Sequence, residues 1–423
     1  MNQMLLQSTS LYKKLQKRYS RRINLDLSRI KKVLYKLDNP HLFLTNPINI
    51  IGSDGKMSVL TSLKFFLESN KENTTAFTSP HLYDVRHRIW LKDKYISINK
   101  IKKLIYIIEK TKLKLTLFEL LTCVYVLAAK ELKDVSYNLV ESGLLFKKDS
   151  TNLWSKPKAQ IITNINFQHQ EWVRPRTLNE ICRQKVEGLS KNTKIYIAKQ
   201  KPKTLRIIKK ILKNNPSKII YPSSWKIENN KSKFYYLDKN NKIHIKNKHI
   251  NSKALINNLG LAIKVALDFG VDKKIIIKTI PKIKFEGRVQ YLKKGRLVNL
   301  INKNERLLID GCHSEESAKN LCSYIKTLNY PVYGILGMQK NKLPEKFVKV
   351  FRNSLKKIVT IDIPNEPNSI KADKLKMICE RQNFKTETAK NITDAIKKIS
   401  SKNKKIIVIF GSLYLVGSVL SKN

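Results

Sequence analysis

Apolar residues along the chain form short continuous runs that alternate with longer stretches of helical spacing. Short runs that end at glycine or polar residues are typical of strands buried on both faces. Strands are predicted at 48–51, 74–79, 135–141, 159–166, 194–199, 306–310, 332–337, 358–363 and 404–411. Helices are predicted at 26–37, 58–69, 97–111, 116–132, 177–189, 204–212, 254–270, 314–328, 343–355, 373–382, 392–400 and 413–420. Short strands with turns are expected in 218–248.

The alternation of strands and helices predicts an α/β fold, with parallel sheets and right-handed crossovers. The alternation occurs twice, and the basic segment PKIKFEGRVQYLKKGR (281–296) between the two series lacks a helical period. A chain of 423 residues is also too long for one core. We predict a large phosphate-loop-type domain with a mostly parallel sheet (1–283), a linker (284–296) and a smaller Rossmann-like α/β domain (297–423).

The stretch INIIGSDGKMS (48–58) is the strongest candidate for a binding site. An apolar run ends at Gly52, and Lys56 and Ser58 follow just before a helix. This order describes a loop that binds phosphates through backbone N–H groups, a helix N-terminus and a lysine. Met57 stands where Walker-type loops carry Ser or Thr, so an ordinary strand-to-helix turn with a surface lysine is the alternative.

Other polar residues follow predicted strands, where doubly wound sheets bind their ligands. They are Ser58, Ser79, Glu141, His169 and Asp310. Hydroxyl and carboxylate oxygens suit Mg²⁺, and a histidine suits a second metal position. Each residue taken alone is more often a helix cap, a surface residue or a core residue.

The formal net charge of +52 raises the possibility of nucleic-acid binding. The basic residues are nevertheless spread along the whole chain together with abundant Asn and Ile, which suggests AT-rich coding. The densest run, KKLQKRYSRR (13–22), has Tyr19 as its single aromatic residue. The charge would also favour small anionic substrates.

The predicted compartment is the cytoplasm. The five cysteines contain no CxxC pair, so neither a disulfide framework nor a zinc site is expected. The N-terminus lacks the apolar core of a signal peptide. The apolar helix 116–132 contains Glu119 and is too short to span a bilayer.

Ten segments match one known family in order. They are INLDLSRIKKVLYKLDNP (23–40), GSDGKMS (52–58), FTSPHLYDVRHRI (77–89), TLFELLT (116–122), ESGLLFKKDSTN (141–152), NFQHQEWV (166–173), ICRQKVEG (181–188), EGRVQ (286–290), DGCHSEES (310–317) and GSLYLVGSVL (411–420). Together they resemble the folylpolyglutamate synthase / dihydrofolate synthase family, relatives of the Mur-type ligases. GSDGKMS resembles that family's GTNGKGS, and NFQHQEWV resembles its LDH segment.

The resemblance implies ATP-dependent ligation of L-glutamate to a pteroate or folate carboxylate through an acyl phosphate. The enzyme would be a dihydrofolate synthase, a folylpolyglutamate synthase, or both. ATP would be the co-substrate and Mg²⁺, as two ions, the cofactor. The implied partners are small molecules (ATP, L-glutamate, and dihydropteroate or a reduced folate), with no nucleic acid and no membrane, and the protein would be a monomer.

The resemblance also implies residue roles. The catalytic residues would be Lys56, His169 and Lys185. ATP would contact Gly52, Asp54, Gly55, Lys56, Ser58, Asn258, Arg288, Asp310 and His313. Mg²⁺ would bind Ser58, Ser79, Glu141, His169 and Lys185, the lysine as its carbamate, because an anionic oxygen binds Mg²⁺ and an ammonium does not. The pterin pocket would include Phe118, Asp149, Thr151 and Asn152.

Several residues depart from the family pattern. Met57 replaces a glycine, and it would be strained if that position needed a positive φ. Asp54 replaces an asparagine and puts a negative charge near the phosphates. Leu145 and Phe146 replace two glycines, while Gln168 and Gln184 replace acidic residues. These changes keep open a second interpretation, a diverged non-catalytic homologue that retains the nucleotide-binding fold.

Overall fold

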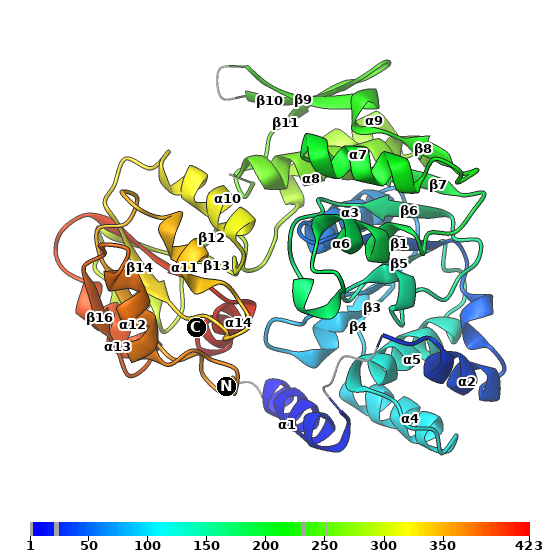
Figure 1. The fold of residues 1–423 in the computed structure, drawn as a ribbon, viewed down its shortest axis with the longest axis horizontal. Helices are drawn as coiled ribbons and strands as arrows, with labels where there is room; N and C mark the ends of the chain where they lie inside the picture. The colour runs from blue at the N-terminus through cyan, green and yellow to red at the C-terminus, as the bar shows by residue number, and fades with distance from the viewer. Residues whose placement is uncertain (1–2, 21–24, 231–232, 251) are drawn as a thin grey trace. The chain divides into compact units, whose positions relative to one another are not determined.

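The structure is a computed structural model, and it describes residues 3–20, 25–230, 233–250 and 252–423. The chain divides into two compact units. The larger unit comprises Asn2–Asn247 and Leu255–Ile283, and the smaller unit comprises Lys248–Ala254 and Lys284–Asn423. Each unit is built on its own sheet with helices packed against it, which confirms the predicted α/β class (Figure 1).

The main sheet of the larger unit has eight strands in the order β4-β3-β2-β5-β1-β6-β7-β8. The six strands from β2 to β8 in this order are parallel, and β3 and β4 add an antiparallel edge. The sheet is therefore mostly parallel, as predicted. The strands are β1 (Pro47–Ile51), β2 (Thr74–Phe77), β3 (Ile89–Leu91), β4 (Lys94–Tyr95), β5 (Tyr137–Glu141), β6 (Ala159–Ile162), β7 (Lys194–Ile197) and β8 (Lys218–Ile220).

Helices and two hydrophobic core clusters surround this sheet. One cluster joins the second, fourth and fifth helices to the sheet, and the other joins the sixth and seventh helices to it. The fifth helix is buried nearly all round, because apolar residues cover most of its faces. The helices are α1 (Gln3–Arg18), α2 (Ser28–Lys36), α3 (Lys56–Ser69), α4 (Ile98–Glu109), α5 (Leu117–Lys130), α6 (Leu178–Val186), α7 (Pro202–Ile211), α8 (Lys253–Asp268) and α9 (Lys273–Thr279).

A second, three-stranded antiparallel sheet lies against α8 in the larger unit (Figure 1). Its strands are β9 (Trp225–Asn230), β10 (Lys233–Asp238) and β11 (Lys242–Ile245). Gly260 of α8 permits the close approach, because a Cβ there would lie 2.7 Å from the side chains of Trp225 and Ile227.

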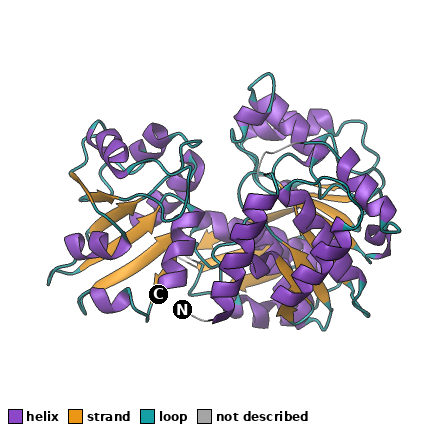
Figure 2. Ribbon diagram, turned by 90° about the horizontal axis from the view of Figure 1, so that it is seen from below, coloured by secondary structure: helices purple, strands orange, loops and turns teal. Residues whose placement is uncertain are grey.

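The smaller unit has a six-stranded sheet in the order β12-β13-β17-β14-β15-β16, which is parallel except for β12. Figure 2 shows helices on both sides of these strands. The strands are β12 (Gln290–Leu292), β13 (Glu305–Asp310), β14 (Val332–Leu336), β15 (Ile358–Thr360), β16 (Thr386–Thr388) and β17 (Lys405–Phe410). The helices are α10 (Glu315–Ile325), α11 (Pro344–Lys349), α12 (Ala372–Glu380), α13 (Ile392–Ile399) and α14 (Leu413–Lys422).

The structure differs from the predicted elements in a few places. The segment expected as a linker contains β12, which pairs with β13. The helix expected at 343–355 is confined to α11. Besides β12, five elements were not predicted: α1, α9, β3, β4 and β16. The three strands are only two or three residues long, too short for an alternating pattern.

The basic run 13–22 is helical up to Arg18, and Arg21 and Arg22 lie outside the described residues. The same holds for Ile23 and Asn24, where the first matched segment begins. In the described part of the chain, no helix combines the length and the apolar character needed to cross a membrane.

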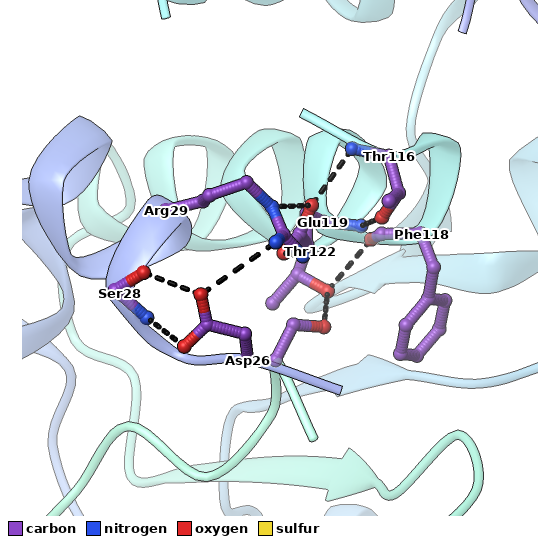
Figure 3. Close-up of polar contacts among 8 residues, drawn as sticks. Asp26, Ser28, Arg29, Thr116, Phe118, Glu119 and Thr122 are labelled. Carbon is purple, nitrogen blue, oxygen red and sulfur yellow. Dashed lines mark hydrogen bonds and ion pairs between the residues drawn. The ribbon is translucent and has the colours of Figure 1, made fainter. Parts of the chain in front are cut away.

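An ion pair between a partly exposed arginine and a buried glutamate connects α2 to the start of α5 (Figure 3). Thr116 caps α5 by accepting a hydrogen bond from the Glu119 N–H, and the Glu119 carboxylate accepts one from the Thr116 N–H at 2.7 Å. The same carboxylate is 2.7 Å from the Arg29 guanidinium. Glu119 of the capping box in the TLFE segment thus also binds the Arg29 cation, which lies about 90 residues earlier in the chain.

We expect Arg29→Met to lower the free energy of unfolding by about 2 to 3 kcal/mol, because it leaves the buried Glu119 carboxylate without its cation. Adding Glu119→Gln should restore more than half of the loss, since the amide keeps an acceptor for Thr116 without the charge. Urea unfolding followed by circular dichroism measures both variants. Equal losses in the single and double variants would contradict this role of the pair.

Candidate functional site

The predicted site residues of the larger unit lie at one edge of its main sheet. The strands β2, β5, β1 and β6 are neighbours and run parallel, so their carboxyl ends meet at this edge. Gly52 follows β1, Ser79 follows β2, Glu141 ends β5 and His169 lies in the loop after β6. The topology thus brings together residues that are more than 100 positions apart in the sequence.

Two glycines shape the loop between β1 and α3. Gly52 has φ +147°, and a Cβ there would lie 2.0 Å from Thr163 Oγ1. Gly55 has φ +93° and directly precedes α3, and a Cβ there would lie 2.7 Å from the Asn258 side chain. Both positions therefore require glycine.

Met57 is accommodated without strain. It lies in the first turn of α3, outside the residues with positive φ, and its side chain is partly exposed to solvent. The possible strain at this position is therefore absent, because the left-handed conformation falls on Gly55.

Lys56 and Ser58 are held by the loop itself. Lys56 Nζ donates to the carbonyls of Gly52 and Ser53 at 3.3 and 3.4 Å. Ser58 Oγ donates to the Gly55 carbonyl and accepts from Asn258 Nδ2, each at 2.9 Å. Asn258, which is 200 residues from Ser58 in the sequence, is thus brought onto the loop by α8.

Glu141 is the buried carboxylate of the site, at 3% exposure. Its Oε2 accepts a hydrogen bond from the Ser79 N–H at 3.0 Å, and its Oε1 lies 3.9 Å from Lys56 Nζ. A buried carboxylate at the same sheet edge as two serine hydroxyls is a set of hard oxygen donors that fits Mg²⁺. Among the described residues, no three His, Cys, Asp or Glu side chains gather as a metal-binding group.

Lys185 is completely buried at the end of α6. Its Nζ donates to the carbonyls of Gly52 at 3.0 Å and Leu144 at 2.6 Å. Burial, and to a smaller extent the Lys56 cation, lowers the pKa of Lys185 from 10.5 to about 7. A large fraction of this amine is therefore uncharged near neutral pH, which is the form that can add CO₂ to give a carbamate.

Asp54 binds the loop after β6. Its Oδ2 accepts hydrogen bonds from Asn166 Nδ2 at 2.7 Å and Gln168 Nε2 at 2.8 Å. Backbone bonds from Ser53 and Asp54 to the Asn164 carbonyl add to this connection. The Asp54 carboxylate is therefore stabilised by two amide donors.

One of these bonds connects two residues that depart from the family pattern, Asp54 and Gln168. Asp54 stands where the matched motif has an asparagine, and Gln168 stands where it has an aspartate. The amide and the carboxylate have changed places, so one hydrogen bond between the two loops is possible in either arrangement. The simultaneous exchange was the signal in the sequence that the pair is in contact.

The loop 142–152 contains three of the four predicted pterin-pocket residues. Asp149 accepts hydrogen bonds from the N–H groups of Leu144 and Thr151, both at 3.0 Å, and from the Thr151 hydroxyl at 2.6 Å. Asn152 Nδ2 donates to the carbonyls of Lys147 and Gly188. Asp149, Thr151 and Asn152 thus fix the shape of the loop, and a substrate role for them stays a prediction.

Phe118 and Gly143 form the close contact between α5 and this loop. A Cβ on Gly143 would lie 2.6 Å from the Phe118 ring. Leu145 and Phe146, which replace two glycines, are fully buried in a core cluster with Ile51 and other apolar residues. Their side chains therefore fill the core. Gln184, the other replaced acidic residue, donates to Glu180 at 2.7 Å within α6.

The smaller unit carries the remaining predicted ATP-binding residues. Asp310 ends β13 and accepts hydrogen bonds from the N–H groups of Val289 and Cys312 at 2.9 and 2.8 Å. Burial raises the pKa of Asp310, and the Arg288 cation opposes this rise. His313 follows within three residues, just before the Ser314 cap of α10. The structure thus groups Arg288, Asp310 and His313 near the carboxyl end of β13.

Comparison with known proteins gives full-length matches. The family model described as "Dihydrofolate synthetase, C-terminal domain" matches residues 293–422. The chain is 25% identical over 441 residues to a dihydrofolate synthetase of Saccharomyces cerevisiae, covering 94% of this chain and 97% of the relative. It is 22% identical over 421 residues to a dihydrofolate synthase/folylpolyglutamate synthase of Bacillus subtilis, covering 93% of this chain and 94% of the relative.

Solved structures match over the same extent. The folylpolyglutamate synthase of Mycobacterium tuberculosis complexed with ADP has a TM-score of 0.86 at 19% identity, covering 99% of this chain and 98% of that one. The E. coli protein FolC in complex with DHPP and ADP has a TM-score of 0.83 at 18% identity, covering 97% and 96%. Together these matches confirm the resemblance noted in the sequence.

The burial of Lys185 predicts a pH dependence of stability. Between about pH 7 and 10.5 the unfolded state binds more protons at this lysine than the folded state, so its burial destabilises the fold less as the pH rises. From pH 7 to pH 8.5 the free energy of unfolding should rise by about 1 to 2 kcal/mol relative to Lys185→Met. Urea unfolding in CO₂-free buffer measures this difference, and a constant difference would contradict the lowered pKa.

The exchanged pair predicts a rescue. Gln168→Glu should lower kcat/KM for ATP about tenfold or more, because it places a second carboxylate beside Asp54. Adding Asp54→Asn should restore most of the activity by re-forming the bond with its donor and acceptor exchanged. A double-mutant cycle measures the coupling, expected at about 1 to 2 kcal/mol. Additive effects of the two substitutions would show that the pair is independent.

Proposed function

We propose that this chain, a relative of the folylpolyglutamate synthase / dihydrofolate synthase family, is an ATP-dependent ligase that joins L-glutamate to dihydropteroate. The observation that carries the proposal is the proximity of Lys56, Glu141 and Lys185 to the phosphate loop. The fold around them is similar to that of ligases of this family over nearly the whole chain. The match of residues 293–422 to a dihydrofolate synthetase model favours dihydropteroate over a folate as the acid substrate.

The proposed reaction has two steps. The substrate carboxylate attacks the γ-phosphorus of ATP and forms an acyl phosphate with release of ADP. The α-amine of glutamate then attacks the acyl carbon, phosphate leaves, and the amine proton is lost to form the amide. Lys56 lies where it stabilises the negative charge that develops on the transferred phosphoryl group.

Mg²⁺ supplies charge neutralisation at the phosphates in such a site. The residues proposed to hold it are Ser58, Ser79, Glu141, His169 and the carbamate of Lys185. Hydrogen bonds within the protein already orient two of these residues. The Ser79 N–H orients Glu141, and the carbonyls of Gly52 and Leu144 orient Lys185. Two amides keep the Asp54 carboxylate bound to the loop that carries His169.

The remaining assignments follow from the same proposal. Gly52, Gly55, Asn258, Arg288, Asp310 and His313 contribute to ATP binding, and Phe118, Asp149, Thr151 and Asn152 shape the pterin pocket. The partners are ATP, glutamate and the pteroate, and the protein acts as a monomer in the cytoplasm. The non-catalytic alternative loses its main support, because Met57 is unstrained and Leu145 and Phe146 fill the core.

Ligation of L-glutamate should require dihydropteroate, ATP and Mg²⁺ together, and dihydropteroate should be used better than tetrahydrofolate. Mass spectrometry of the product with parallel measurement of ADP release tests this. Lys185→Ala should abolish ligation with an unchanged circular dichroism spectrum, while Lys319→Ala, on the exposed face of α10, should not. Wild-type turnover by Lys185→Ala would refute the role of the carbamate, and absence of turnover by the wild type would support the non-catalytic alternative.

A further inference from the structure

Arg88 is a buried cation close to the site. It ends the 3₁₀ turn Val85–Arg88 and precedes β3, with 7% of its surface exposed. The Arg88 carbonyl accepts a hydrogen bond from the Thr78 N–H at 2.9 Å. Ser79 directly follows Thr78 in the chain. Arg88 is therefore attached to the strand end that carries Ser79 and, through the Ser79 N–H, Glu141.

The contacts of Arg88 leave part of its guanidinium available. Its Nε donates to His81 Nδ1 at 2.9 Å, and its guanidinium carbon lies 5.9 Å from the centre of the Tyr12 ring. The His81 ring meets the same tyrosine edge-on, with ring centres 4.4 Å apart. His81 accepts this hydrogen bond through Nδ1, so the contact supplies no negative charge to Arg88.

No carboxylate pairs with Arg88 among the described residues. Asp84, the acidic residue of the same turn, is bound instead by Arg86, with oxygen–nitrogen distances down to 2.5 Å, and by Ser8. The nine positions outside the described ranges include no Asp or Glu. A buried guanidinium without a counter-ion is unfavourable, because it loses hydration without gaining an ion pair. A bound anion would remove this cost.

We propose that Arg88 binds a carboxylate of one of the substrates, with His81 and Tyr12 as residues that position it. The inference rests on the proposed function, which supplies two carboxylate-bearing ligands: the pteroate that becomes phosphorylated and the incoming glutamate. The Nη groups of Arg88 have no hydrogen bond or ion pair to a described residue. A planar guanidinium can bind a carboxylate through two parallel hydrogen bonds. Nucleotide binding is left to Lys56 and the phosphate loop.

The two carboxylate sources are distinguished by equilibrium binding. Calorimetry with dihydropteroate and, separately, with L-glutamate is carried out on the protein saturated with Mg²⁺ and a non-hydrolysable ATP analogue. Arg88→Met should lower the affinity for one of the two ligands by about tenfold or more. The affinity for the ATP analogue should stay within twofold, which a general disturbance of the site would not allow. The ligand whose affinity falls is the one that Arg88 binds.

Two further variants make the result decisive. Arg88→Lys keeps the charge but loses the planar pair of donors and the bond to His81, so it should show a smaller loss for the same ligand. Arg352→Met, an exposed arginine of the smaller unit, serves as the matched control and should leave both affinities unchanged. If Arg88→Met fails to fold by circular dichroism, Arg88→Lys decides the question.

The outcomes separate this inference from the proposed function. Unchanged affinities for both ligands in the Arg88 variants, with a wild type that binds and ligates them, would overturn the role of Arg88 and leave the ligase proposal intact. A wild type that binds neither ligand would overturn both. In steady state, the expected loss appears in the KM of the affected substrate, with the KM for ATP unchanged.

Discussion

The candidate site depends on the burial of one amine. Lys185 Nζ, enclosed at the end of α6, has the carbonyls of Gly52 and Leu144 as its hydrogen-bond acceptors. Because an unsatisfied buried amine is costly, these bonds fix the phosphate loop, the loop after β5 and α6 relative to one another. The same burial lowers the pKa of the amine, so the structural constraint also produces the chemical property that carbamate formation needs.

The other charges of the site follow a rule of local pairing. In the larger unit, the Ser79 N–H donates to Glu141, Lys56 lies near the same carboxylate, and Asp54 accepts hydrogen bonds from two side-chain amides. Arg88 stands apart, since its described partners are a histidine and an aromatic ring. Among the described residues, Arg88 thus lacks an oppositely charged partner that would offset the cost of burying its charge.

The sheet order explains why residues distant in the sequence form one site. Strands β2, β5, β1 and β6 are neighbours although β3, β4, α4 and α5 lie between β2 and β5 along the chain. Local patterns identified the strand ends that carry Ser79, Glu141 and Gly52, and the general rule for parallel sheets placed them at one edge. The contact of Asn258 with Ser58 had no such local signal, because it depends on how α8 packs beside the phosphate loop.

The sequence by itself determined the α/β class, most strands and helices, the phosphate loop and the family resemblance, because these depend on hydrophobic periodicity and on short motifs that are local in the chain. It could not assign β3, β4 and β16, which are too short to show a period. Only the tertiary structure decided how the departures are accommodated. Met57 is helical, Leu145 and Phe146 enter the core, and Asp54 meets Gln168. Each of these outcomes depends on backbone conformation or on partners far along the chain, which no local pattern encodes.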